Sequence, residues 1–327
     1  ERARKNGYGA IVSFRLKDEH ALLEPPCKIY DENMDLRLNH NPKAPFGVRG
    51  FSWRYPLVRQ YVFDLMTEIC ENYDIDGLEM DFMRFFPYFD LETTSEPERT
   101  RIMTDFIVKV RDLLNRTAKP GQKRYLAVRV PNNIDEYQSI GLDLGYLDYN
   151  ELVDIVSVSC SYVSQLDTDF NLIRKWAPSS AMFLEMDFCA ARGKNLGWGF
   201  AKDPRGTGPE GYWMEYVTDQ MHYTAANLAW AQGADGMYTF NFPYYRFIDK
   251  EPPFHVFSKF KDKEWLKQQD QNYWMPAWWL TGYNGRQYQL PETFVVDTRK
   301  EFVWKMALPE SGAKSARLRL KFDKCDV

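Results

Sequence analysis

The chain has 327 residues, of which 44% are hydrophobic, 27% charged and 16% aromatic. This length suits one large α/β barrel domain with a smaller domain appended, and only the aromatic share departs from an ordinary globular composition. The 46 acidic and 42 basic residues give a net charge of −4 without a basic run, which argues against a nucleic-acid-binding protein. No run of 18 apolar residues occurs, so we expect no membrane-spanning helix.

Six segments alternate between polar and apolar residues, the pattern of β-strands with two different faces. They comprise residues 11–16, 76–82, 125–131, 154–161, 182–188 and 235–242. Between several of these strands, apolar residues recur every three or four positions, which predicts helices. We expect helices from Val58 to Tyr73 after Pro56, from Ile102 to Leu113, and from Met214 to a stop at Gly233. Strands alternating with helices predict βαβ units and a parallel sheet.

The pentapeptide LEMDF occurs twice, in the second and the fifth of these strands. Its apolar residues share one face of each strand, while Glu79 and Asp81, or Glu185 and Asp187, share the other face. Buried parallel strands usually consist of continuous apolar runs, so a polar second face needs a reason. A (β/α)8 TIM barrel supplies one, because inward residues near the carboxyl ends of its strands line the mouth where active sites form.

The predicted barrel is incomplete, and a second module follows it. A (β/α)8 barrel has eight strands, so we interpret the six segments as strands three to eight, with two strands preceding Glu1. An open six-stranded sheet is the alternative. We assign residues 1–270 to the partial barrel, ending in a helix over 252–269, and residues 271–327 to the start of a β-sandwich-like module. Its strands are expected in ETFVVDT, EFVWKMAL and SARLRLKFD.

The acids of the two pentapeptides are the candidate catalytic groups. Glycoside cleavage commonly uses two carboxyl groups, one to protonate the leaving oxygen and one as nucleophile or base. Strands four and seven of a barrel face each other across its mouth, so the two copies could flank a sugar. Asp81 and Asp187 lie nearest the strand ends, and Glu79 and Glu185 lie one step deeper.

The segment YDIDGLEMDFMR resembles the fourth-strand signature of bacterial family-10-like glycosyl hydrolases, in which a DG-x-x-x-D pattern ends the strand, and IVSFRLKDEH resembles their preceding strand and loop. The resemblance covers roughly residues 5–245. It implies a secreted, periplasmic or cell-surface barrel that degrades polysaccharides, with Asp81 as acid/base, Glu185 as nucleophile and a retaining mechanism. The Asn-Glu pair usual in that clan is missing here, and Met83 occupies the final acid position of a chitinase-like DGxDxDxE pattern.

Further residues around the predicted mouth are candidates for substrate binding. Arg15, His20, Arg84 and Arg129, with Lys17, would gather cations suited to carboxylate or sulfate groups of an acidic polysaccharide. The long glycine-rich segment 192–213 carries aromatic candidates for stacking on sugars. The remaining candidates, including these aromatics, are Asp18, Tyr162, Trp198, Trp213 and Asn241.

No sequence feature requires a metal or a cofactor. The chain lacks the P-loop, the Rossmann glycine fingerprint, HExxH and the EF-hand pattern, and the consecutive residues 18–20 are poorly placed to converge on a metal. The five cysteines show no ligand spacing, so we expect free, mostly buried thiols. They are Cys27, Cys70, Cys160, Cys189 and Cys325.

Two alternatives to a hydrolase stay open. The inward acids and arginines could neutralise one another as a buried ion-pair network that needs no substrate, leaving an inactive carbohydrate-binding barrel. The same acids could also transfer protons in a lyase or an isomerase. The sequence therefore favours a glycoside hydrolase acting on a neutral or acidic polysaccharide, without deciding between these chemistries.

Overall fold

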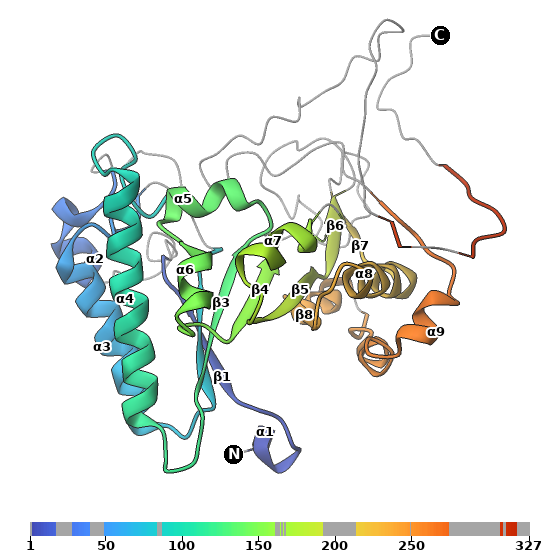
Figure 1. Cartoon of the computed structure of the whole chain (residues 1–327), viewed down its shortest axis with the longest axis horizontal. Coiled ribbons are helices and arrows are strands. Elements are labelled where there is room, and N and C mark those ends of the chain that lie inside the picture. Colours follow the sequence, from blue (N-terminus) through green and yellow to red (C-terminus); the bar gives the residue numbers. More distant parts are fainter. Residues whose placement is uncertain are drawn as a thin grey trace, which may run out of the picture. The chain divides into compact units, whose positions relative to one another are not determined.

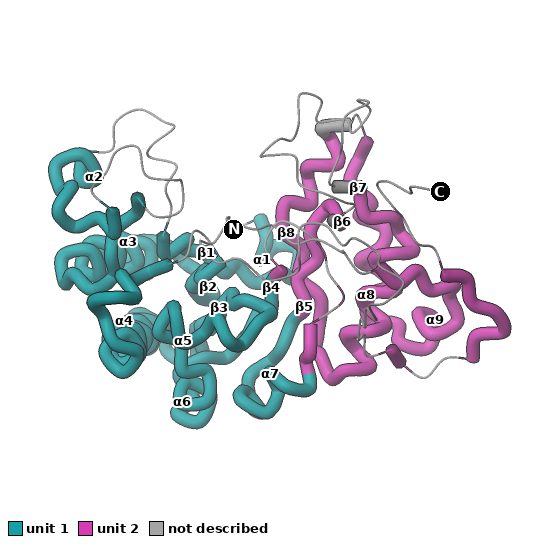
Figure 2. Tube along the Cα trace, turned by 90° about the horizontal axis from the view of Figure 1, so that it is seen from above, with its two compact units in different colours: residues 1–159, 171–183, 281–288 teal, residues 160–170, 184–280, 289–327 magenta. Residues whose placement is uncertain are grey.

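The computed structural model describes most of the chain in two compact units. The described residues are 2–17, 28–39, 49–83, 87–160, 164, 166, 168–191, 214–248, 250–274, 308–309 and 312–318. Unit 1 comprises residues 1–159, 171–183 and 281–288, and unit 2 comprises residues 160–170, 184–280 and 289–327 (Figure 2). The boundary expected from the sequence, between residues 270 and 271, stays a prediction.

All six predicted strands are present in one sheet (Figure 1). They are β1 (Ile11–Arg15), β2 (Gly77–Asp81), β3 (Tyr125–Pro131), β4 (Ile155–Ser159), β5 (Ala181–Asp187) and β8 (Gly236–Phe240). The sheet has the order β1-β2-β3-β4-β5-β8, and the first three neighbouring pairs are parallel. The predicted α/β class with consecutive parallel strands is therefore confirmed, and it is consistent with part of a (β/α)8 barrel. A separate antiparallel pair joins β6 (Cys189–Ala191) and β7 (Met214–Tyr216).

The two long helices of unit 1 form where the sequence pattern placed them. Helix α3 (Pro56–Asn72) begins with proline in its first turn, where the missing N–H costs nothing. Helix α4 (Glu96–Thr117) follows Ser95 and carries acidic residues in its first turn, which suits the positive end of the helix dipole. The two helices contact each other, and α4 also contacts β3. On α4, Phe106 packs edge-on against Trp53 with ring centroids 4.9 Å apart.

One face of the sheet in unit 1 is uniformly apolar. Its side chains in β2, β3 and β4 are Leu78, Met80, Leu126, Val128, Val130, Val156 and Val158, and all are fully buried. Because side chains alternate along a strand, the polar residues of these strands share the opposite face. The alternation read from the sequence thus predicted correctly which residues join the hydrophobic core.

The shorter elements of unit 1 are α1 (Arg2–Lys5), α2 (Lys28–Glu32), η2 (Met34–Leu36), η3 (Ile134–Glu136), α5 (Tyr137–Ile140), α6 (Leu144–Tyr149) and most of α7 (Phe170–Trp176). The unit's chain turns sharply after α5, where Gly141 has a φ of +74°. A left-handed residue is a common helix stop, and glycine adopts it without strain.

Two helix predictions in unit 2 are wrong in their bounds. Helix α8 spans Asp219–Ala231, so Met214 lies in β7 and Val217 lies between the two elements. The Thr218 side chain accepts a hydrogen bond from the Met221 N–H and caps the helix, which fixes its start. The single helix expected over 252–269 is two pieces, η5 (Phe254–Ser258) and α9 (Lys263–Lys267), because Asp262 caps a new helix.

The C-terminal module is only partly within the described residues. ETFVVDT lies outside them, only Leu308 of EFVWKMAL is described, and residues 315–318 of the third predicted strand are described but form no strand. The other element of unit 2 is η4 (Phe242–Ile248), which follows β8 directly. The β-sandwich stays a prediction.

Two further expectations can be compared with the described residues. Among them, no helix is both long enough and apolar enough to cross a membrane. Cys70, Cys160 and Cys189 are buried free thiols, as expected. Cys27 and Cys325 lie outside the described residues.

A pair of glycine substitutions tests the packing of unit 1. A Cβ at Gly141 would lie 2.4 Å from the Arg99 carbonyl oxygen, whereas a Cβ at Gly121, with a φ of +77°, meets nothing within 4 Å. We expect Gly121→Ala to cost about 1 kcal/mol of stability through its φ alone. Gly141→Ala should cost about 2 kcal/mol more through the clash. Urea unfolding of both variants measures this, and equal midpoints would contradict it.

A buried histidine makes the stability of unit 2 depend on pH. His222 is fully buried, and its Nε2 lies 3.1 Å from the Tyr245 hydroxyl, which itself donates to the Val217 carbonyl. Nε2 must therefore donate to Tyr245, and Nδ1 is buried without a hydrogen-bond partner. Burial lowers the pKa of His222 from 6.5 to about 4. In the folded protein, His222 therefore stays neutral until the pH falls well below 6.

We predict that unfolding measurements show a loss of stability as the pH falls from 6.5 to about 4, where the unfolded histidine binds a proton and the folded one does not. The loss should be about 3 kcal/mol. His222→Gln keeps an N–H for Tyr245 but does not titrate, so its stability should change less over this range. Parallel curves for parent and variant would contradict the prediction.

Candidate active site

The polar face of the sheet in unit 1 carries the candidate residues in two rows. The strand register places Glu79 beside Ser13 on β1 and beside Ala127 on β3. One step closer to the carboxyl ends, Asp81 lies beside Arg15 and Arg129. Parallel pairing brings the carboxyl ends of these strands to the same edge, so the second row lies where a barrel forms its active site.

Asp81 and Arg129 form a buried ion pair. Arg129 Nη1 lies 2.9 Å from both carboxylate oxygens of Asp81, and the residues are 2% and 1% exposed. Arg129 Nη2 donates to Ser159 Oγ on β4 at 3.1 Å, and the Met83 N–H donates to Asp81 Oδ1 at 2.8 Å. Both carboxylate oxygens of Asp81 are therefore engaged by Arg129.

Glu79 has a different setting from Asp81. Its Oε1 accepts a hydrogen bond from the neutral Ser13 hydroxyl at 2.7 Å, and its side chain is buried. The two acids thus keep the shared face that the sequence predicted, with a hydroxyl beside one and a guanidinium beside the other.

Backbone contacts hold the carboxyl ends of β1 and β2 together. The Asp81 carbonyl accepts from the Leu16 N–H at 3.2 Å and from the Tyr88 hydroxyl at 3.3 Å. The Leu16 carbonyl in turn accepts from the Trp53 indole at 3.2 Å. These buried donors leave little freedom to the backbone that carries the candidate acid.

Glu185 and Asp187 lie at the carboxyl end of β5 in unit 2, and both are buried. Asp187 Oδ1 accepts from the Phe188 N–H at 2.6 Å. Ser164 Oγ bridges the Asp187 backbone, donating to its carbonyl and accepting from its N–H, both at 2.9 Å. The Trp274 indole donates to the Ser164 carbonyl at 3.0 Å, which places an aromatic side chain near this strand end.

Asn241, at the carboxyl end of β8, has an unusual backbone. Its φ is +51°, in the left-handed region that few residues other than glycine adopt, and its Nδ2 is buried without a hydrogen-bond partner. Such a combination costs free energy and is often found at functional sites. Asn241 therefore keeps its place as a candidate substrate-binding residue.

The other predicted site residues fall into two groups. Arg15 is exposed at the end of β1, and Lys17 is buried. The remaining candidates lie outside the described residues: Asp18, His20, Arg84, Tyr162, Trp198 and Trp213. Glu79, Asp81 and Arg129 come together on one face of unit 1, whereas Glu185, Asp187 and Asn241 belong to unit 2. That the two sets face one mouth stays a prediction.

Sequence reasoning missed three polar residues of unit 1. Ser13 and Ser159 contact the candidate charges, and their positions in the alternating strands could have indicated this. Glu136 is buried in η3 just after β3, at the same edge of the sheet as Asp81. Its place in a loop gave no periodic signal, although a loop after a barrel strand is where catalytic acids are found.

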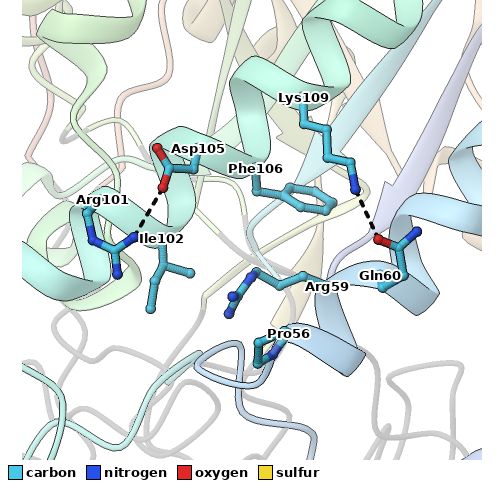
Figure 3. Close-up of a pocket in the computed structure, with 8 residues that line it drawn as sticks. All are labelled: Pro56, Arg59, Gln60, Arg101, Ile102, Asp105, Phe106 and Lys109. Atoms are coloured by element: carbon cyan, nitrogen blue, oxygen red, sulfur yellow. Dashed lines mark hydrogen bonds and ion pairs between the residues drawn. The ribbon is translucent and has the colours of Figure 1, made fainter.

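A hollow of about 230 Å³ lies between α3 and α4 (Figure 3). Its rim carries two polar contacts, Arg101 with Asp105 at 3.2 Å and Lys109 with Gln60 at 3.0 Å. Pro56, Arg59, Ile102 and Phe106 complete its lining. None of these lining residues is a candidate active-site residue.

The described residues contain no group of three or more histidine, cysteine, aspartate or glutamate side chains arranged to hold a metal ion. The expectation that the chain needs neither metal nor cofactor stays a prediction.

No protein-family model and no curated protein matches the chain. Among solved structures, it is similar to a chitinase-like agglutinin from Robinia pseudoacacia, with 11% identity and a TM-score of 0.48 over 80% of this chain and 82% of that one. A glycoside hydrolase family 18 N-acetylglucosaminidase from Paenibacillus barengoltzii has 13% identity and a TM-score of 0.45 over 66% and 80% of the two chains.

A multi-modular cell-surface chitinase from a Paenibacillus strain has 14% identity and a TM-score of 0.46 over 67% of this chain, which spans only 33% of that protein. Likeness at these values carries no argument about activity or substrate. None of the three is described as family-10-like, so that resemblance also stays a prediction.

A matched pair of arginine substitutions tests the buried ion pair. Arg129→Met leaves the Asp81 charge buried without its partner, which should lower the free energy of unfolding by about 3–5 kcal/mol. Arg101→Met removes the cation of the Arg101–Asp105 pair, whose side chains are 66% and 67% exposed. This substitution should change the free energy of unfolding by less than about 1 kcal/mol. Urea unfolding compares the two. A small effect of Arg129→Met would show that Asp81 is not held as a buried charge.

Proposed function

We propose that the chain is a glycoside hydrolase that cleaves glycosidic bonds in a polysaccharide. The observation that carries the proposal is the presence of two acids, Glu79 and Asp81, on the polar face of a parallel sheet close to its carboxyl edge. Each acid is hydrogen-bonded to a side chain of a neighbouring strand. Glycoside cleavage needs carboxyl groups in two different protonation states. Glu79 accepts a hydrogen bond from the Ser13 hydroxyl and Asp81 contacts the Arg129 guanidinium, and each acid is thus held by a neighbouring strand.

The ion pair changes the roles that the resemblance implies. Asp81 was expected to be the acid/base, but both of its carboxylate oxygens contact Arg129. In this mechanism, Asp81 stabilises the positive charge of the oxocarbenium-like transition state. Proton donation and nucleophilic attack then fall to Glu79, Glu185 and Asp187, with Glu185 retained as the nucleophile of a retaining mechanism.

The charge of the substrate is a separate question. Arg129 had been expected to bind a carboxylate or sulfate of the substrate, yet its two terminal nitrogens contact Asp81 and Ser159. Arg15 is the exposed cation near the same strand ends within the described residues. Both neutral and acidic substrates therefore belong in the test.

One observation favours a second function, a carbohydrate-binding barrel without catalysis. Asp81 is held by an arginine on both oxygens, and the buried Met83 stands where a chitinase-like pattern has its final acid. A mouth built in this way could bind a glycan and leave it intact. Proton transfer by the same acids in a lyase or isomerase has no specific contact in its favour.

Hydrolysis of a panel of neutral and acidic polysaccharides separates these functions. We expect cleavage by the parent protein, and a loss of at least about 100-fold in kcat for Glu185→Gln, because a positioned acid or base contributes about that much or more. Asp81→Asn should also lose cleavage while retaining substrate binding. Glu71→Gln changes a half-exposed acid on α3 and serves as the control with parental activity.

The anomeric form of the first product, followed by NMR, tests the retaining mechanism. Binding without cleavage by the parent would favour the binding barrel. Full activity of Glu185→Gln and Asp81→Asn would remove both acids from the proposal.

A further inference from the structure

Unit 1 exposes a group of aromatic side chains on α6 and at the end of α7. Tyr146 is 49% exposed, Tyr149 is 86% exposed and Trp176 is 50% exposed. Within residues 137–160 and 171–183, the exposed large hydrophobic side chains are these three, and all three are aromatic. We call Tyr146, Tyr149 and Trp176 the α6–α7 aromatic patch.

The patch is assembled by a close approach of two elements. A Cβ at Gly145 on α6 would lie 3.3 Å from Trp176 Cε3, so the indole packs directly over this glycine. Tyr149 lies four residues after Gly145 and therefore on the same side of the helix, one turn further along. Tyr146 directly follows Gly145 and is three residues from Tyr149, which again makes the two tyrosines neighbours on the helix surface.

A buried carboxylate fixes this arrangement. Asp148 on α6 is 3% exposed, and its Oδ1 accepts from the Ser180 N–H at 2.7 Å and from Ser180 Oγ at 2.6 Å. Its Oδ2 accepts from the Ser179 N–H at 3.1 Å. The segment that follows Trp176 is thus tied to the helix that carries both tyrosines. A binding surface whose backbone is already fixed needs less ordering when a ligand arrives.

The patch is remote from the carboxyl ends of the strands in unit 1. Tyr149 ends α6 a few residues before β4 begins at Ile155, and Trp176 ends α7 a few residues before β5 begins at Ala181. Both therefore lie near the amino ends of their strands. Asp81, Arg129 and Ser159 lie at the other ends, so the patch is not part of the candidate active site.

The composition of the patch indicates which ligand it fits. Aromatic faces carry partial negative charge and attract the weakly positive C–H groups of a sugar ring, while sugar hydroxyls bind polar groups around the ring. Exposed polar neighbours of both kinds are present, namely Asn150, Glu151, Lys175 and Ser179. One acid and one base leave this surface without net charge, which suits an uncharged glycan better than a polyanion.

A protein partner fits the patch less well. Stable protein interfaces bury about 800 Å² on each partner, whereas an aromatic side chain offers at most about 250 Å², and two of these three are only half exposed. The patch also exposes none of its aliphatic neighbours, since Leu144 and Leu147 are buried. Its area matches a few sugar rings.

We propose that the α6–α7 aromatic patch binds an uncharged polysaccharide chain by stacking, at a surface site separate from the candidate active site. The site would hold the protein on a polymer while the strand ends act on it. The binding itself does not rest on the proposed hydrolase activity.

Affinity gel electrophoresis tests the patch, with hydroxyethylcellulose and glycol chitin as polymers and polygalacturonate as the anionic comparison. We expect the parent to be retarded by at least one of the first two. Trp176→Ala and Tyr149→Ala should each weaken that retardation about tenfold, as loss of a ring contact does. Trp176→Phe, which keeps a ring, should stay within about threefold of the parent, and Tyr8→Ala, which removes another tyrosine that is 70% exposed, should change nothing.

Tyr149 is so exposed that its substitution should not disturb folding, which circular dichroism checks for each variant. No retardation of the parent by hydroxyethylcellulose or glycol chitin would overturn the proposal, as would parental retardation of both alanine variants. Retardation by polygalacturonate alone would overturn it too, because it would indicate binding through charge. Trp176→Ala and Tyr149→Ala leave the candidate acids unchanged, so loss of patch binding and loss of hydrolysis are separate outcomes.

Discussion

A charge buried inside a protein must be neutralised where it lies, and the Asp81–Arg129 ion pair does this on the polar face of the sheet. Both side chains are almost fully buried, and the contacts run from β2 to β3 and on to Ser159 of β4. Removing either partner would leave an uncompensated charge in a medium that solvates it poorly. The register of three strands and the chemistry of one candidate acid therefore depend on the same interaction.

Because of this constraint, the two faces of each strand have different roles. The face that carries Leu78 and Met80 joins the hydrophobic core and needs no polar partner. The opposite face keeps Glu79 and Asp81 because their partners are on neighbouring strands at the same level. A parallel sheet can hold charges in its interior only where such partners are aligned. The repeated pentapeptide LEMDF uses the same alternation on β2 and β5, in two different units.

Much of the architecture could be predicted because the signals are local. Alternating residues marked all six strands and their apolar faces, and Pro56 marked the start of α3. The start of α8 was missed because Met214 and Val217 fit a helical spacing that the Thr218 cap overrides. The ion pair itself was beyond the sequence, since the choice of Arg129 as the partner of Asp81 depends on strand register. Exposure depends on tertiary packing in the same way, so Trp176 and Tyr149 gave no signal.

The central claim is that sugar binds against the polar face at the carboxyl ends of the strands. A crystal structure of the Glu185→Gln variant soaked with an oligosaccharide of the polysaccharide that the parent binds or cleaves tests it most directly. We predict a sugar ring within hydrogen-bond distance of Glu79 or Asp81, with the Asp81–Arg129 contact intact. A sugar found only on the helical surface, with the strand ends closed and empty, would contradict it.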